Sequence, residues 1–293
     1  MNWWKQLKGK VKLKEPLKNY TSFRIGGEAK FFIEPKDITD LKLLLKFKKR
    51  YKLPILVMGA GTNILVNDQG LKAIVLRLSS PYFKKFYFNK DYLYASSGVK
   101  LSRLINASLE KSLSGLEFLI GIPGTLGGAL VMNAGIPGKN IADLVKEIEV
   151  MDYQGRIKMI NKREANFGYR SSGLSKYIIL GATIKLKKKN KKIIKEKIKN
   201  YLNWRRNTQE TNIASAGCIF KNPKSISAGR LIDLCGLKGK RIGDAMISLK
   251  HANFILNLRR AKAKDVLALM RLIKKVVKYK FGIELEPEIK IWN

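Results

Sequence analysis

The stretch from Gly115 to Gly135 reads GLEFLIGIPGTLGGALVMNAG, a run that is rich in both glycine and apolar residues. Residues 118–136 carry no charge, and a membrane helix needs roughly 20 apolar residues. The five glycines of this span, together with Pro123, Thr125 and Asn133, argue against such a helix. Two interpretations stay open here: a tight buried turn between core elements, or a backbone whose N–H groups point at an anion such as a diphosphate.

Another glycine loop, Met58–Val66 with the sequence MGAGTNILV, follows the apolar run Leu53–Val57, which has the length of a buried strand. In chain order it is the first glycine loop, and the one within Gly115–Gly135 is the second. Gly59 and Gly61 match the first two glycines of the dinucleotide-binding fingerprint. No third glycine or helical pattern follows, and G-x-G alone is weak evidence. The two glycine loops stand about 60 residues apart, so both are candidates to hold the phosphates of one dinucleotide.

These loops and several later motifs resemble one protein family. The run VMGAGTNILVNDQGLKAIVLRLS, followed by GLEFLIGIPGTLGGALVMNAG, is similar to the flavin-binding half of the UDP-N-acetylenolpyruvoylglucosamine reductase family. FGYRSS, AGCIFKNP, KHANFILN and LEPEIK follow in the family's order, so that the resemblance covers Asn19 to Ile291. It implies an α+β fold, in which a two-part FAD-binding region of the PCMH/vanillyl-alcohol-oxidase-like type precedes a C-terminal α+β substrate-binding domain.

The resemblance also implies a division of the chain. Residues 1–18 would be a peripheral basic segment, 19–188 the FAD-binding domain with two subdomains, 189–202 a linking helix, and 203–293 the substrate-binding domain. The run KLKKKNKKIIKEKIK at 185–199 has an apolar stripe at helical spacing, which fits a solvated linking helix. The long insertion of one family subtype is missing, which suggests the compact subtype.

The family's cofactor is FAD, and NADPH is its hydride donor. Several members of the wider superfamily bond the flavin to a histidine near the motif that reads RIGGEA here, but the only histidine of this chain is His251. We therefore expect non-covalent FAD. The residues expected to contact it lie in the two glycine loops: Gly59, Ala60, Gly61, Thr62, Asn63, Ile64, Gly121, Ile122, Pro123, Gly124 and Thr125.

The family reduces UDP-N-acetylglucosamine enolpyruvate to UDP-N-acetylmuramate, a precursor of peptidoglycan, and three residues match its catalytic positions. Arg170 in FGYRSS matches an arginine that binds and stabilises an enolate. Glu288 in LEPEIK matches the carboxylate that works with it, and Glu286 is the nearby alternative. Cys218 in AGCIFKNP matches the proton donor, which is more often serine; a thiol is the stronger acid of the two.

Two further residues are carried over as substrate contacts. Asn222 matches a contact to the substrate diphosphate, and Tyr169 is expected to line the same pocket. Cys235 falls on the apolar face of a predicted helix, and His251 precedes a predicted strand, so both are interpreted as structural.

The composition is ordinary apart from its charge. The chain has 293 residues, of which 45% are hydrophobic, and its 59 Lys and Arg against 22 Asp and Glu give a formal net charge of +37. Such an excess suggests a nucleic-acid or anionic-membrane partner. It is spread over the whole chain without a base-reading motif, so we favour compositional drift and expect neither specific nucleic-acid binding nor membrane insertion. The charge would still attract NADPH and a UDP-sugar.

Other classes of protein are less consistent with the sequence. Two cysteines and one histidine indicate neither a disulfide scaffold nor a metal site, and the basic N-terminal segment lacks the apolar region of a signal peptide. A monomeric, cytoplasmic protein is expected. An oxidase or dehydrogenase of the same fold would not explain AGCIFKNP and LEPEIK together, and a nucleic-acid-binding protein would not explain the paired glycine loops.

Periodicity and turn signals predict the secondary structure. The predicted strands are 31–33, 53–57, 73–78, 177–186 and 253–256, the hairpins 83–96 and 147–160, and the helices 37–52, 101–113, 227–235 and 263–279.

Overall fold

The structure is a computed structural model, and it describes residues 2–293. The chain forms two compact units, and neither is continuous in sequence. Unit 1 consists of Met1–Leu13, Phe31–Gly59 and Ala73–Trp204, and unit 2 consists of Lys14–Lys30, Ala60–Lys72 and Arg205–Asn293. The domain boundaries expected from the family resemblance follow the chain differently and stay a prediction.

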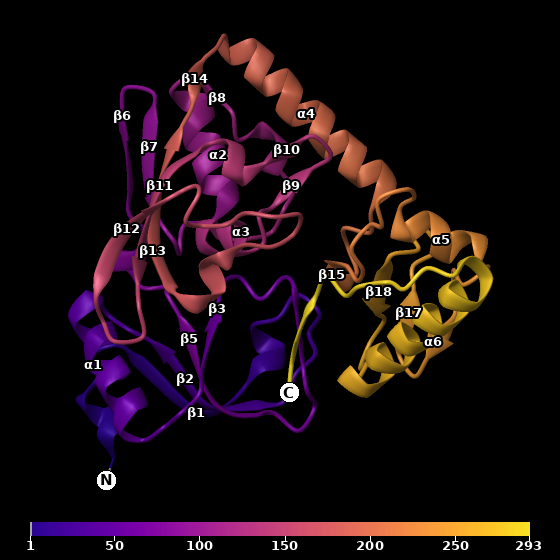
Figure 1. The fold of residues 1–293 in the computed structure, drawn as a ribbon, viewed down its shortest axis with the longest axis horizontal. Helices are drawn as coiled ribbons and strands as arrows, with labels where there is room; N and C mark the ends of the chain where they lie inside the picture. The colour runs from indigo at the N-terminus through magenta and orange to yellow at the C-terminus, as the bar shows by residue number, and fades with distance from the viewer. Residues whose placement is uncertain (1) are drawn as a thin grey trace. The chain divides into compact units, whose positions relative to one another are not determined.

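The larger sheet of unit 1 has five antiparallel strands (Figure 1). Their order is β12 (Ile157–Asn161), β11 (Val145–Met151), β13 (Ile178–Lys185), β7 (Tyr92–Ser96) and β6 (Phe86–Asn89). Both predicted hairpins are confirmed. Each turns through a residue in the left-handed region, Lys90 at φ +53° and Gly155 at φ +85°, which matches the twist of the paired strands.

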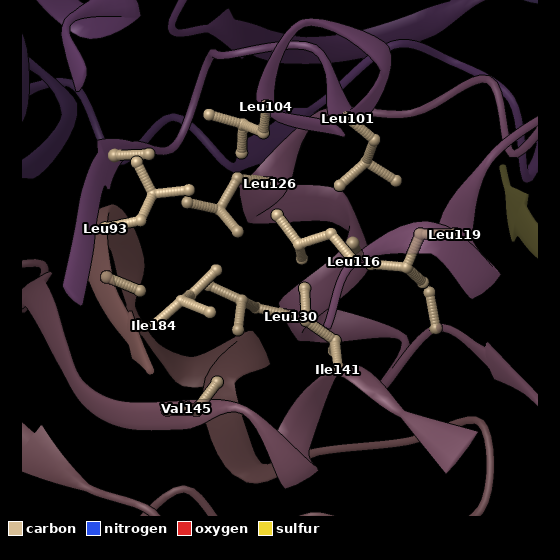
Figure 2. Close-up of a cluster of buried hydrophobic side chains, with 14 of the residues drawn as sticks. Leu93, Leu101, Leu104, Leu116, Leu119, Leu126, Leu130, Ile141, Val145 and Ile184 are labelled. Carbon is tan, nitrogen blue, oxygen red and sulfur yellow. The ribbon is translucent and has the colours of Figure 1, made fainter. Parts of the chain in front are cut away.

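Two helices pack on the inner face of this sheet, α2 (Leu101–Glu110) and α3 (Leu126–Val131). Figure 2 shows Leu93 and Ile184 of the strands around the same apolar space as Leu104 and Leu126 of the helices. These side chains are fully buried, and each buried leucine or isoleucine stabilises the fold by about 1.5–3 kcal/mol. α2 ends before residue 113 because Leu113–Ser114 forms β8, which pairs with β14 (Lys187–Lys188).

The central stretch folds into short elements rather than one helix. It contains η4 (Glu117–Leu119), then α3, and ends in β9 (Gly135–Ile136). The side chain of Thr125 caps α3 by accepting a hydrogen bond from Gly128 N at 3.3 Å. No helix among the described residues is long and apolar enough to cross a membrane.

A four-stranded sheet contains the N-terminal strands. Its order is β1 (Lys10–Pro16), β2 (Glu28–Glu34), β5 (Leu71–Arg77) and β3 (Ile55–Met58), so the predicted strands at 31–33, 53–57 and 73–78 are confirmed. The predicted helix is α1 (Ile38–Arg50), which begins at Asp37, whose side chain accepts a hydrogen bond from Asp40 N.

The first residues are not peripheral, contrary to expectation. Trp3, in η1 (Trp3–Gln6), is only 3% exposed, and its ring lies 5.0 Å from Phe31 and 5.2 Å from Phe47. The basic residues near Trp3 favoured a peripheral segment. The structure shows instead that this tryptophan anchors the segment, because its ring buries a large apolar area.

Unit 2 has its own sheet and core. The strand order is β15 (Ala214–Cys218), β18 (Phe254–Asn257), β17 (Ala245–Ile247) and β16 (Arg241–Ile242). Helices α5 (Ala228–Leu234) and α6 (Ala263–Phe281) confirm the two predicted here, and α6 buries the expected stripe against the unit's core. A parallel pair, β19 (Lys290–Trp292) with β4 (Ile64–Val66), joins the chain end to the last residues of the first glycine loop.

Helix α4 (Lys191–Thr208) corresponds to the charged helix predicted from the sequence. Ile194 is buried, whereas Lys191 lies at the surface with its Nζ 2.5 Å from Glu110. The remaining short elements are η2 (Leu17–Asn19), η3 (Pro81–Lys84), β10 (Lys139–Asn140), η5 (Ile141–Asp143) and η6 (Gly173–Lys176).

Candidate functional site

In unit 1 the end of β3 lies next to the start of α3, so that Gly59 approaches Thr125 and Gly128. A Cβ on Gly59 would lie 2.9 Å from Thr125 Oγ1 and 3.7 Å from Gly128 Cα. Only a bare backbone fits at Gly59. Gly59 and the start of α3 are therefore neighbours within unit 1, and the expectation that both loops hold one dinucleotide stays a prediction.

The glycines of the second loop differ in what requires them. A Cβ on Gly127 would lie 2.9 Å from Ser97 Cβ, so packing inside the protein excludes a side chain there. At Gly128 the nearest atom is Thr125 Oγ1 at 3.6 Å, and at Gly124 it is Leu101 Cδ1 at 3.6 Å, both ordinary contacts. A helical glycine costs about 0.5–1 kcal/mol relative to alanine. At Gly128 nothing within the chain explains that cost, which fits a ligand that approaches the backbone.

In unit 2 the first loop continues with the segment 60–64. Gly61 has φ +69°, and a Cβ there would overlap the carbonyl oxygen of Tyr20, so glycine is required by the fold. Among the hydrogen bonds of residues 2–293, none is donated by the backbone N–H of Ala60, Gly61 or Thr62. Consecutive amides without protein acceptors suit an anionic group such as a phosphate of FAD. The residues present thus fit the expected cofactor.

Other expected cofactor contacts have roles within the protein. Asn63 donates from Nδ2 to Glu288 O at 3.2 Å, and its own carbonyl accepts from Lys290 N at 2.9 Å. Ile64 is buried at the start of β4. Gly121 and Pro123 are exposed and remain accessible to a ligand.

Arg170 lies in a tight turn of unit 1, between Gly168 and Ser171, which are paired by a hydrogen bond from Gly168 N to Ser171 O. Its φ of +51° is uncommon for a residue with a Cβ, and such strain clusters at functional sites. The guanidinium carbon lies 5.6 Å from the centre of the Tyr169 ring, and Tyr169 is 52% exposed. The turn thus presents a cation and an aromatic ring side by side.

Two hydrogen bonds connect the turn that contains Arg170 to the stretch Gly115–Gly135. Asn133, which is 5% exposed, donates from Nδ2 to Gly168 O at 2.9 Å, and Ser172 Oγ donates to Val131 O at 2.9 Å. No such role of Asn133 was predicted from the sequence. An asparagine within an apolar, glycine-rich run was the signal that could have identified it.

Cys218 is the last residue of β15 and is half-buried in unit 2. The pairing of β15 with β18 shifts between Ser215 and Cys218, which makes a bulge that contains Gly217 at φ +75°. Bulges redirect the following side chain and are frequent next to active sites. Gly217 therefore allows the backbone conformation that sets the direction of the Cys218 side chain.

The same unit brings Glu288 to the segment that follows Cys218. Glu288 N donates to Ile219 O at 2.8 Å, and Phe220 pairs with Pro287. Glu288 is half-buried.

Glu286, the alternative carboxylate, has another partner. Its Oε1 lies 2.5 Å from Lys221 Nζ, and its side chain is 69% exposed. The two glutamates therefore differ in their surroundings. Glu286 forms an ion pair with Lys221 at the surface, whereas the backbone of Glu288 contacts Ile219, the residue after Cys218.

The remaining candidates have structural partners. Asn222 Oδ1 accepts from Ala228 N at 3.0 Å, which leaves its Nδ2 group to contact a ligand. His251 Nδ1 accepts from Asn253 N at 3.3 Å, and its ring lies 4.7 Å from Phe254. Burial, with a smaller effect from Lys238, lowers the pKa of His251. Cys235 packs against the unit 2 core, and burial raises the pKa of its thiol.

Comparison with known proteins defines the class first: the chain carries an FAD-binding domain of the type found in flavin-dependent oxidoreductases. The family model described as FAD binding domain matches residues 29–161. Solved structures of a solvent-stable cholesterol oxidase and of 6-hydroxy-D-nicotine oxidase from Arthrobacter nicotinovorans cover 62% of the chain, and the chain covers 38% and 43% of theirs. Their TM-scores are 0.51, and at 14% and 16% identity they show the fold alone, which confirms the expected fold class.

The particular family follows from closer relatives. The family model of the UDP-N-acetylenolpyruvoylglucosamine reductase C-terminal domain matches residues 208–292. A reductase of that name from Symbiobacterium thermophilum is 40% identical over 97% of this chain and 93% of its own length, and one from Caldanaerobacter subterraneus is 42% identical over 97% and 94%. The crystal structure of the Thermus caldophilus reductase has a TM-score of 0.83, at 37% identity, over 98% of this chain and 100% of its own. The chain belongs to the UDP-N-acetylenolpyruvoylglucosamine reductase family.

Proposed function

We propose that Arg170, Cys218 and Glu288 perform the chemistry of this family in the present chain. The chain is an FAD-containing oxidoreductase that uses NADPH to reduce UDP-N-acetylglucosamine enolpyruvate to UDP-N-acetylmuramate, in the synthesis of peptidoglycan precursors. The observation that carries this conclusion is identity of about 40% to reductases of that name over nearly the whole length of both chains. The roles of the individual residues are our inference.

Bound FAD would supply the hydride chemistry between NADPH and the methylene carbon of the enolpyruvyl group. For FAD we propose backbone contacts from Gly59–Ile64 and Gly121–Thr125. The amides of Ala60, Gly61 and Thr62 support this assignment in unit 2, and the open backbone of Gly124 supports it in unit 1.

Addition of hydride to the methylene carbon leaves negative charge on the neighbouring carbon, which is conjugated with the substrate carboxylate. Arg170 binds that carboxylate and stabilises the enolate, since a guanidinium offers two parallel hydrogen bonds together with its positive charge. The strained backbone of Arg170 and its contact with Tyr169 favour one orientation of this group. Glu288 polarises or protonates the carboxyl end of the enolate.

Cys218 completes the reaction by donating its thiol proton to the carbon next to the carboxylate. The bulge at Gly217 and the link from Glu288 N to Ile219 O support this role, because they fix the direction of the thiol close to the glutamate's backbone. General acid catalysis of this kind contributes roughly 100- to 10,000-fold to a rate. Water then restores the proton to the thiolate.

Tyr169 and Asn222 are proposed as substrate contacts. The exposed ring of Tyr169 and the Nδ2 group of Asn222 can each contact a ligand. The net charge of +37 favours the approach of two anionic substrates, NADPH and a UDP-sugar. A monomeric state and a cytoplasmic location also belong to the proposal, the latter because the substrates of this family's reaction are soluble nucleotides.

An anaerobic experiment tests the function. The purified protein is loaded with FAD, reduced with NADPH and mixed with UDP-N-acetylglucosamine enolpyruvate while the flavin absorbance is followed. We expect rapid reoxidation with formation of UDP-N-acetylmuramate. Flavin that NADPH reduces and this substrate leaves reduced would contradict the proposal and favour an oxidase or dehydrogenase of the same fold.

A further inference from the structure

Asn253 lies immediately before β18 and is 1% exposed. Its side-chain amide makes two hydrogen bonds to the backbone of one residue: Oδ1 accepts from Phe220 N at 2.9 Å, and Nδ2 donates to Phe220 O at 2.8 Å. The backbone carbonyl of Asn253 also accepts from Ile219 N at 2.8 Å. Asn253 therefore holds both residues that follow Cys218.

This contact begins where the regular sheet ends. Cys218 is the last residue of β15 and pairs with Phe254, and the next backbone groups have passed the end of the strand. The amide of Asn253 then takes the place of a strand partner, because it offers a donor and an acceptor with the geometry of a peptide group. Cys218 is consequently fixed on both sides, by the bulge at Gly217 before it and by the Asn253 amide after it.

The held segment also positions the glutamate. Ile219 gives its N–H to Asn253 and its carbonyl oxygen to Glu288 N, so one residue connects Asn253 with Glu288. The side chains of Ile219 and Phe220 are fully buried in the core of unit 2, which leaves the thiol of Cys218 as the half-buried group of this segment.

We propose that Asn253 is a positioning residue for proton transfer: its buried amide fixes the 218–220 backbone so that the Cys218 thiol and Glu288 keep the geometry that the reaction needs. This inference rests on the proposed role of Cys218. It assigns a chemical purpose to an asparagine that would otherwise count as part of the core.

The variant Asn253→Ser removes the paired hydrogen bonds while leaving a small polar side chain. Because a displacement of about 1 Å can cost about 100-fold in rate, we expect the substrate to reoxidise reduced flavin about 100-fold more slowly. Reduction of the flavin by NADPH should change by less than about twofold, because this variant alters proton delivery to the substrate. Slowed proton transfer should also increase the solvent deuterium isotope effect on reoxidation.

Asn257, the last residue of β18, provides a matched control. It is 5% exposed, donates from Nδ2 to Phe23 O at 2.8 Å and accepts at Oδ1 from Ala261 N at 3.0 Å. Asn257→Ser therefore removes the same number of hydrogen bonds from an equally buried amide, away from the 218–220 segment. We expect comparable destabilisation with reoxidation within about threefold of the wild type, because catalytic loss needs a displaced reactive group.

A second measurement does not use the reaction. The rate at which iodoacetamide alkylates Cys218, followed by mass spectrometry of its peptide, reports how firmly the thiol is held, and Cys235 is the internal reference. Asn253→Ser should raise the Cys218 rate about tenfold, as expected for a thiol whose access has increased. Asn257→Ser should leave it unchanged. If the serine variant does not fold, Asn253→Gln retains the amide but moves it by one methylene and is measured in its place.

The outcomes separate this inference from the proposed function. If Cys218→Ala reduces substrate at the normal rate, the proton-donor role is wrong, whatever the Asn253 variants show. If Cys218→Ala is inactive and Asn253→Ser matches Asn257→Ser in reoxidation and alkylation, the positioning role is wrong and the proposed function stands. In the background of Cys218→Ala, Asn253→Ser should add less than about twofold to the loss, because both changes remove one proton transfer.

Discussion

The glycines at the start of α3 in unit 1 and the pair Cys218 and Glu288 in unit 2 differ in whether the backbone or the side chain is the part offered to a ligand. At Gly124 and Gly128 the missing side chains matter, since they leave the backbone open to approach. At Cys218 and Glu288 the side chains matter, and backbone hydrogen bonds hold them in place. The first region is suited to binding a cofactor and the second to acting on a substrate.

The difference has a kinetic consequence. A change to a cofactor loop should weaken FAD binding and so reduce both half-reactions, whereas a change at Cys218 should affect only the reduction of substrate. Variants that separate the half-reactions therefore test whether the two regions are as distinct as the structure suggests.

The largest effect is expected from Cys218→Ala. Because alanine has no proton to give, reoxidation of the flavin by substrate should slow about 1,000-fold, within the usual range for general acid catalysis. NADPH should still reduce the flavin at the wild-type rate. Anaerobic stopped-flow absorbance measures both steps separately.

Cys218→Ser is the matched control for this prediction. The hydroxyl is of similar size and can donate a proton, so we expect reoxidation within about tenfold of the wild type. An alanine variant that turns over as fast as the serine variant would remove Cys218 from the mechanism and leave unit 2 without its proton donor.

The same contrast explains what the sequence could predict. The strands, hairpins and helices with clear periodicity, such as α6 and the two hairpins, were correct, because their patterns reflect burial on one face. The glycine loops could be recognised from the local enrichment of glycine within apolar sequence. Motif positions selected Cys218 and Glu288 as candidates, but their connection through Ile219 depends on backbone contacts between residues far apart in the chain, which periodicity does not encode.

Two misjudged regions show the limits of local patterns. Trp3 lay among lysines and was taken as peripheral, yet tertiary packing against Phe31 and Phe47 buries it. Asn253 lay in a recognised motif and received no role, because one asparagine in a strand pattern does not reveal which backbone it contacts. Both depend on partners that are distant in sequence.

An intermediate effect is expected from Gly128→Ala in the cofactor region. The added methyl group meets only ordinary contacts inside the protein and improves helix propensity, so the FAD-free protein should gain about 0.5–1 kcal/mol in unfolding free energy. The same methyl group would occupy open backbone surface beside Thr125, one of the residues that we assign to FAD, so the dissociation constant for FAD should rise about tenfold, equivalent to about 1.4 kcal/mol. Fluorescence titration and chemical denaturation measure these quantities.

Gly229→Ala is the control for that prediction. Gly229 lies in helix α5, and a Cβ there would lie 3.4 Å from His251 Cε1, the limit of ordinary contact. It should change stability in a similar way without altering FAD affinity. If Gly128→Ala also left FAD affinity unchanged, the open glycine backbone would not be part of the cofactor site.

The smallest effect on catalysis is expected from His251→Gln. This variant tests whether the histidine beside the unit 2 sheet takes part in proton transfer. Burial lowers the pKa of His251 below its unfolded value of about 6.5, so the folded protein binds a proton less readily than the unfolded chain. The resulting stability is present above that unfolded value and is lost as the pH falls through the folded pKa. His251→Gln should therefore weaken the loss of stability on acidification, measured by denaturation at about pH 7 and about pH 5.

Both half-reactions should stay within about twofold of the wild type, because we assign the proton transfer to Cys218. Reoxidation slowed by about tenfold or more would instead place the histidine in the proton pathway, and the thiol would then not be the sole acid of this region.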